Sequence, residues 1–253
     1  MAISDYVNRF PLHPHILFET LAYLFGFQLY RFLRSRYGDA VSSPNRWSVI
    51  AAAAVGAALG SKLLFFLEDP RFTLAHLHDP VALMGGKTII GGLIGGLFAV
   101  ELTKKLCGIQ QRTGDLFAVP LCLGIAIGRL GCFFTGLADN TYGIPTVLPW
   151  GVDFGDGIRR HPVQLYEVVF ALALGLLLFR WFQRPHVSGD IFKGFMVSYA
   201  AFRLVIDSLK PYPRFVGLCT LQWTCLGLLA YYAPDLWRWF SRAPSTRASE
   251  AAA

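Results

Sequence analysis

Residues 116–134 read LFAVPLCLGIAIGRLGCFF, and this stretch decides the class of fold. The hydrocarbon core of a bilayer is crossed by a helix of about 20 predominantly apolar residues. Arg129 is the one charged side chain within the stretch. We therefore predict a transmembrane helix that carries a single guanidinium group near one end.

The composition of the whole chain also indicates a membrane protein. Of the 253 residues, 54% are hydrophobic and only 15% are charged, whereas soluble domains contain about 25% charged residues. The 21 Phe, 10 Tyr and 6 Trp residues exclude a disordered chain. The five cysteines have the spacing of neither a disulfide framework nor a zinc site. Runs apolar enough to cross a membrane lie at 15–33, 47–67, 83–103, 116–134, 164–182, 193–209 and 216–236.

The Lys and Arg residues between these runs predict the orientation. Most of them follow the first, third, fifth and seventh runs. Cytoplasmic loops are enriched in Lys and Arg, which places the N-terminus in the periplasm and the C-terminus in the cytoplasm. We predict an all-α membrane protein with about seven transmembrane helices, in which 1–243 form a single domain and 244–253 a disordered tail. This topology accounts for the net charge of +7, which therefore does not indicate nucleic acid.

Charged side chains within the runs gather at one depth. Such groups are costly in a membrane and usually mark a functional path. With the direction of each run taken into account, they all fall in the outer half of the membrane, which predicts one polar site that opens to the outer leaflet. They are Glu19, Lys62, Lys87, Arg129, Glu167, Arg203 and Asp207.

Simpler interpretations stay open for some of these groups. Lys62 and Lys87 can extend their side chains to the interface, and Arg203 with Asp207 can form an i,i+4 ion pair on one helix face. Arginine nevertheless suits a phosphate group, because its planar guanidinium binds phosphate through two hydrogen bonds and stays protonated. Arg129 and Arg203 at headgroup depth would bind an anionic lipid and stabilise charge on a departing phosphate.

Arg129 belongs to the segment 128–136, GRLGCFFTG, which leads on to Gly143. Glycines after an arginine can expose backbone N–H groups to an anion. Glycines four residues apart are also typical of close helix packing. Such pairs occur at 91/95, 92/96 and 124/128.

A second segment, 161–167, reads HPVQLYE. Pro162 fits the start of a helix, which puts His161 at the outer mouth of the fifth run. Gln164 and Glu167 are three residues apart and share a helix face. They can shape a polar site or form hydrogen bonds between helices.

We predict neither a metal site nor a cofactor. Two H-x-H pairs occur in segments expected outside the membrane. No Cys, Asp or Glu at ligand spacing clearly completes either pair. The pairs are His13/His15 and His76/His78.

At the segments 128–133 and 161–167 the chain resembles the bacterial prolipoprotein diacylglyceryl transferases. The resemblance implies a seven-helix protein of the bacterial cytoplasmic (inner) membrane. Its partners would be phosphatidylglycerol and a lipoprotein precursor, and the diacylglyceryl group would be moved to a cysteine thiol with release of glycerol phosphate. Weaker similarities lie at Tyr23–Phe27, Gly91–Gly95, Phe202–Arg203 and Gln222.

The resemblance also assigns residues to roles. As catalytic residues it implies Arg129 and Arg203, which would hold the phosphate, together with His161 and Asp207. As substrate-binding residues we expect Gly131, Gly143, Gln164, Tyr166 and Glu167.

The chain departs from the family pattern at several positions. Ile90 stands where the family has a histidine, and Cys132 and Leu137 replace an asparagine and a glutamate. Asp207 stands in place of a glutamate. The missing histidine is a candidate proton acceptor, for which His161 or Asp207 could substitute. A non-catalytic lipid-binding membrane protein is therefore an alternative, as is a transporter, although no inverted repeat is visible.

Overall fold

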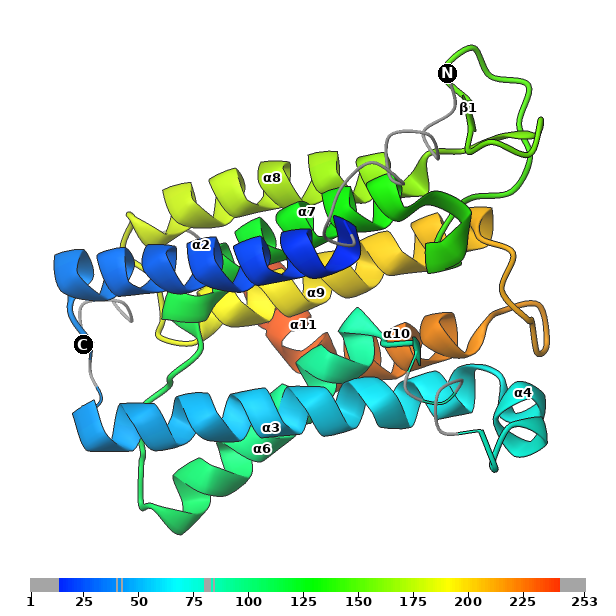
Figure 1. The fold of residues 1–253 in the computed structure, drawn as a ribbon. Helices are drawn as coiled ribbons and strands as arrows, with labels where there is room; N and C mark the ends of the chain where they lie inside the picture. Colours follow the sequence, from blue (N-terminus) through cyan, green and yellow to red (C-terminus); the bar gives the residue numbers. More distant parts are fainter. Residues whose placement is uncertain (1–13, 40, 42, 80–82, 84, 242–253) are drawn as a thin grey trace. The chain divides into compact units, whose positions relative to one another are not determined.

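The computed structural model describes residues 14–241 except 40, 42, 80–82 and 84 (Figure 1). This part of the chain is mostly helical, as the sequence predicts. One short hairpin and two 3-10 turns, η1 (Gly136–Asp139) and η2 (Asp207–Leu209), complete it. The helices are α2 (Pro14–Tyr37), α3 (Ser43–Glu68), α4 (Pro70–Ala75), α6 (Ile89–Leu106), α7 (Asp115–Thr135), α8 (Val163–Phe182), α9 (Asp190–Ile206), α10 (Thr220–Tyr231) and α11 (Ala233–Ser241).

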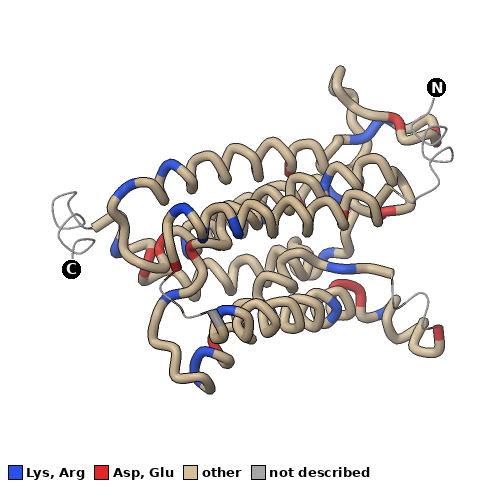
Figure 2. The backbone as a smooth tube through the Cα atoms, turned by 60° about the vertical axis from the view of Figure 1, so that its left-hand side comes forward, with Lys and Arg blue, Asp and Glu red and all other residues tan. Residues whose placement is uncertain are grey.

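Three of these helices are long and apolar enough to cross a membrane: Pro44–Glu68, Asp115–Asp139 and Val163–Phe182. Figure 2 shows that Lys, Arg, Asp and Glu lie mostly near helix ends. The count of seven membrane-spanning helices stays a prediction.

Two predicted runs differ from the observed helices. Helix α6 begins only at Ile89, after the non-helical residues Gly86, Lys87 and Thr88. The seventh run is divided, because α10 ends at Tyr231 and α11 begins at Ala233. Pro234 explains the division, since proline has no N–H to donate and its ring clashes with the carbonyl group four residues earlier.

The chain forms two compact units. The first unit consists of Met1–Gly38, Gly114–Pro211 and Tyr232–Ala253, and the second of Asp39–Thr113 and Tyr212–Tyr231.

In the first unit, α7 packs against α2, α8 and α9 (Figure 1). Phe18 stacks on Phe134, and Tyr30 stacks on Phe117, with ring centroids 5.5 and 4.6 Å apart. These pairs show that α2 and α7 run in opposite directions. The last turn of α2 meets the last turn of α8, where the ring of Tyr37 contacts Phe182 edge-on. The C-terminal end of α7 therefore lies at the same end of this unit as the start of α8.

A two-stranded hairpin precedes α8. Strand β1 (Val152–Asp153) pairs antiparallel with β2 (Arg159–Arg160). The guanidinium of Arg160 donates hydrogen bonds of 2.7 and 2.6 Å to the carboxylate of Asp156. These hydrogen bonds hold the pKa of Asp156 below its usual value. The chain continues from β2 directly into His161, which precedes α8.

In the second unit, α3 and α6 cross at glycines. A Cβ atom at Gly95 would overlap the carbonyl oxygen of Gly56, and one at Gly60 would overlap the carbonyl oxygen of Gly91. The close-packing interpretation is therefore confirmed for Gly91 and Gly95. It is wrong for Gly128, where an added Cβ would meet nothing within 4 Å.

We expect Gly95→Ala to destabilise the protein by about 1–3 kcal/mol, because the new methyl group forces the backbones of α3 and α6 apart. The measurement is the thermal unfolding midpoint of the purified protein in detergent. Gly227→Ala in α10 is the matched control, since a Cβ there meets nothing within 4 Å, and its midpoint should be unchanged or higher. Equal midpoints for the two variants would contradict this packing.

Candidate active site

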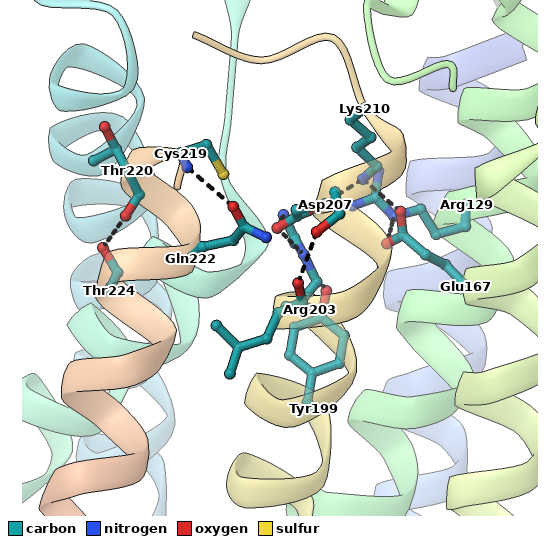
Figure 3. Close-up of polar contacts among 12 residues, drawn as sticks. Arg129, Glu167, Tyr199, Arg203, Asp207, Lys210, Cys219, Thr220, Gln222 and Thr224 are labelled. Carbon is teal, nitrogen blue, oxygen red and sulfur yellow. Dashed lines mark hydrogen bonds and ion pairs between the residues drawn. The ribbon is translucent and has the colours of Figure 1, made fainter. Parts of the chain in front are cut away.

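Charged side chains meet at one end of the first unit, where α7 ends and α8 begins. Arg129 on α7 forms an ion pair with Glu167 on α8, with Nε 2.6 Å from Oε2. The other oxygen of Glu167 accepts a hydrogen bond of 2.7 Å from Nζ of Lys210, which follows η2. Glu167 thus joins two cations from different parts of the chain (Figure 3).

The network continues from Lys210 to the end of α9. Nζ of Lys210 lies 3.4 Å from Oδ1 of Asp207. The other oxygen of Asp207 accepts a hydrogen bond of 2.8 Å from Nε of Arg203, and Nη2 of Arg203 forms an ion pair with it at 2.8 Å. Nη1 of Arg203 lies 3.3 Å from the hydroxyl oxygen of Tyr199. The two arginines singled out from the sequence therefore belong to one connected network (Figure 3).

The charges of this network do not cancel. Arg129 is 6% exposed, and Glu167, Arg203, Asp207 and Lys210 are 1 or 2% exposed. Three cations and two carboxylates leave one net positive charge. Buried charges need partners of opposite sign, and an excess of positive charge among these five side chains would favour a bound anion. The arrangement fits a phosphodiester, which carries one negative charge.

Gln164 adds a neutral polar group beside these charges. It shares a face of α8 with Glu167, and its side chain is fully buried. Neither its amide nitrogen nor its amide oxygen has a hydrogen-bond partner within the described residues. A buried amide without a partner costs free energy, and a polar ligand would remove that cost.

His161 and Tyr166 lie in a separate contact at the mouth of α8. Nδ1 of His161 is 3.4 Å from the hydroxyl oxygen of Tyr166, and that oxygen accepts a hydrogen bond of 2.7 Å from the indole of Trp150. Among the residues that the structure describes, the hydrogen bonds of His161 and Tyr166 form a group separate from the ion pairs of Arg129 and Glu167. The structure thus brings together four of the predicted site residues, Arg129, Glu167, Arg203 and Asp207, and leaves His161 outside their network.

The two predicted glycines serve close approaches of the chain. A Cβ at Gly131 would lie 2.6 Å from Cβ of Phe18 on α2, and a Cβ at Gly143 would lie 2.5 Å from the carbonyl oxygen of His161. Gly131 lets α2 approach α7, and Gly143 lets its own segment approach the start of α8. Both positions fix the surroundings of the site through the backbone.

Two members of the network were not predicted from the sequence. Lys210 follows the sixth apolar run, and it is 1% exposed and bridges Glu167 and Asp207. Its position three residues after Asp207 was the available signal. Tyr199 lies four residues before Arg203, and the same helical spacing could have indicated it.

Other residues that the sequence analysis singled out have local partners. Lys62, in the second unit, donates hydrogen bonds to the carbonyl oxygens of Leu83 and Gly86. Ile90 is fully buried in α6 of the same unit. Cys132 is buried in α7, with its sulfur 3.8 Å from Nη1 of Arg129.

Long apolar helices and a buried network of Arg, Lys, Asp and Glu side chains at one end of the first unit define the class of this protein as a membrane protein with a buried charged cluster. Residues 3–234 match the family model described as "Prolipoprotein diacylglyceryl transferase". The chain belongs to this family.

Curated relatives cover most of the chain. A protein of a Polaromonas species is 30% identical over an alignment 258 positions long, gaps included. The alignment covers 90% of this chain and 92% of the relative. Proteins of Bordetella avium and Bordetella parapertussis are 32 and 31% identical, over 82 and 89% of this chain and 80 and 91% of their own lengths. All three are named phosphatidylglycerol–prolipoprotein diacylglyceryl transferase.

Proposed function

We propose that the protein transfers the diacylglyceryl group of phosphatidylglycerol to a cysteine thiol of a lipoprotein precursor. The sulfur attacks the glycerol carbon that carries the phosphate, the C–O bond breaks, and glycerol phosphate leaves. The thiol proton passes to a base. The observation that supports this function most directly is the buried network of Arg129, Glu167, Lys210, Asp207 and Arg203, in a chain whose family carries out this transfer by name.

In this proposal the cations act on the phosphate group. Arg129 and Arg203 bind its oxygens, and they stabilise the charge that develops as the C–O bond breaks. Glu167 and Asp207 hold the guanidinium groups in place through their ion pairs. Because these contacts exist before substrate binds, little reorganisation is needed during the reaction. Gln164, with its buried amide, supplies a further hydrogen bond to the headgroup, and Gly131, Gly143 and Tyr166 shape the site around it.

We further propose His161 as the group that takes the thiol proton. Asp207 already contacts two cations, Arg203 and Lys210, and Ile90 has no ionisable group. His161 is half-buried at the mouth of α8, and Tyr166 orients its ring. A neutral imidazole is the usual general base at neutral pH.

Replacement of His161 by Gln is expected to lower the rate of transfer by about 10²–10⁴-fold, the usual contribution of general base catalysis. The measurement is kcat with saturating lipid and peptide. His186→Gln is the control, because His186 lies beyond the opposite end of α8. If both variants keep the wild-type rate, His161 does not take the proton.

The membrane topology belongs to the same proposal. Seven helices cross the bacterial inner membrane, 1–243 form one membrane domain, and the N-terminus is periplasmic. The tail predicted at 244–253 lies outside the described residues. In the first unit, the C-terminal ends of α2 and α8 lie together at one end. Arg129 lies near the C-terminal end of α7, which is at the opposite end of the unit. This arrangement supports a lipid site on the periplasmic side. Arg34, Arg36 and Arg180, in the last turns of α2 and α8, would then lie toward the cytoplasm.

The proposed function is tested with purified protein, labelled phosphatidylglycerol and a peptide that contains a lipobox cysteine. The expected result is peptide-dependent release of glycerol phosphate and a peptide made heavier by one diacylglyceryl group. Binding of phosphatidylglycerol with no release would instead support a lipid-binding protein without activity. Complementation of a strain depleted of its own transferase gives an independent measurement in cells.

A further inference from the structure

Three potential metal ligands meet near Arg129. They are His15 in the first turn of α2, Cys132 near the end of α7 and Asp139 at the end of η1. One donor atom of each lies within 4.8 Å of the other two. Nδ1 of His15 is 3.1 Å from Oδ1 of Asp139.

Local features of the chain explain why these residues meet. Gly131 has no side chain, which lets α2 approach, and a Cβ there would lie 3.6 Å from Cα of His15. Gly136 ends α7 with a φ of +67°, a conformation that glycine adopts readily. The chain then turns through η1 and brings Asp139 back toward α2.

The donor set is that of a borderline transition metal. Imidazole nitrogen, thiolate sulfur and carboxylate oxygen are the three ligand types of zinc, and a thiolate disfavours Mg²⁺ and Ca²⁺. A thiolate and a carboxylate together neutralise a divalent cation. Three protein ligands leave a fourth position for water.

Two further contacts orient the ligands. Nε2 of His15, the nitrogen that faces away from Asp139, lies 3.9 Å from Oε2 of Glu19. The hydroxyl group of Thr141 donates a hydrogen bond to Oδ2 of Asp139. Metal-binding histidines usually have a carboxylate near their second nitrogen, and metal-binding carboxylates usually accept an additional hydrogen bond.

We propose that His15, Cys132 and Asp139 bind a divalent transition-metal ion of the zinc class. The ion fastens the turn 136–141 to the first turn of α2. It lies next to the site, since the sulfur of Cys132 is also 3.8 Å from Nη1 of Arg129. The metal holds the wall of the lipid site and takes no part in the transfer step.

Cobalt(II) is the probe for this site. The purified full-length protein is treated with a chelator, dialysed and titrated with Co²⁺ under reducing conditions. We expect a thiolate-to-cobalt charge-transfer band that saturates at one ion per protein and disappears when Zn²⁺ is added. Cys132→Ser should lose the band. Cys122→Ser is the matched control, because Cys122 is also buried in α7 but faces Gly175, and it should keep the band.

A second measurement covers variants that fold poorly. Zn²⁺ should raise the thermal unfolding midpoint of the wild-type protein and of Cys122→Ser, and it should not change that of Asp139→Asn. Absence of the cobalt band in the wild-type protein, or its persistence in Cys132→Ser, would overturn the proposal. Both readouts are independent of lipid transfer, so failure of the proposed function would leave them unchanged.

Discussion

Replacement of Arg129 by Ala is expected to lower the rate of diacylglyceryl transfer by about 10²–10³-fold, the usual loss when one group that stabilises transition-state charge is removed. Arg129 is 6% exposed and contacts Glu167 and the sulfur of Cys132. Its removal leaves the departing phosphate with fewer hydrogen-bond donors. It also leaves Lys210 as the remaining cation in contact with Glu167. The measurement is kcat/KM for release of glycerol phosphate.

Two further variants separate the role of Arg129 from a general loss of positive charge. Arg180→Ala removes an exposed arginine in the last turn of α8 and should keep the wild-type rate. Arg129→Lys keeps the charge but loses the planar, two-pronged geometry, and its rate should lie between those of wild type and Arg129→Ala. A fully active Arg129→Ala variant would remove Arg129 from the site.

Replacement of Glu167 by Gln is expected to destabilise the protein by about 3–5 kcal/mol, the usual cost of leaving a buried cation without its partner. Glu167 is 1% exposed, and its two oxygens contact Arg129 and Lys210. Without its charge, both cations are left with less compensation in an apolar surrounding. The measurement is the free energy of unfolding in mixed detergent micelles.

Glu101→Gln is the matched control for this prediction. Glu101 also forms an ion pair, with Lys104, but its side chain is 51% exposed. Exposed ion pairs contribute about 0–1 kcal/mol, so this variant should be close to wild type. Equal losses of unfolding free energy in the two variants would show that the buried ion pairs of Glu167 stabilise the protein no more than an exposed ion pair does.

Much of the helical framework follows from the sequence. The runs at 116–134 and 164–182 agree with α7 and α8 to within one residue at each end, because each is predominantly apolar and follows Asp115 or Pro162 closely. The prediction of one continuous helix in the seventh run was wrong, because Pro234 interrupts the helix although its neighbours are apolar. The hairpin of β1 and β2 was not predicted, since strands of two residues carry no detectable alternation.

Site residues could be predicted from the sequence only where a charged residue occurs within an apolar run. Arg129, Glu167 and Arg203 stand out because each interrupts an apolar run. Lys210 does not stand out, since a lysine just after a helix normally reaches the interface. His15, Cys132 and Asp139 meet through the packing of α2 on α7, and the sequence carries no local signal for such a contact.

A double-mutant cycle tests most directly whether Arg129 and Arg203 act on one phosphate group. The rate of glycerol phosphate release is measured for Arg129→Lys, for Arg203→Lys and for the double variant. If both guanidinium groups bind the same phosphate, the two effects should differ from additivity by about 0.5–3 kcal/mol in activation free energy. Additivity to within about 0.3–0.5 kcal/mol would show independent sites and would contradict the shared network.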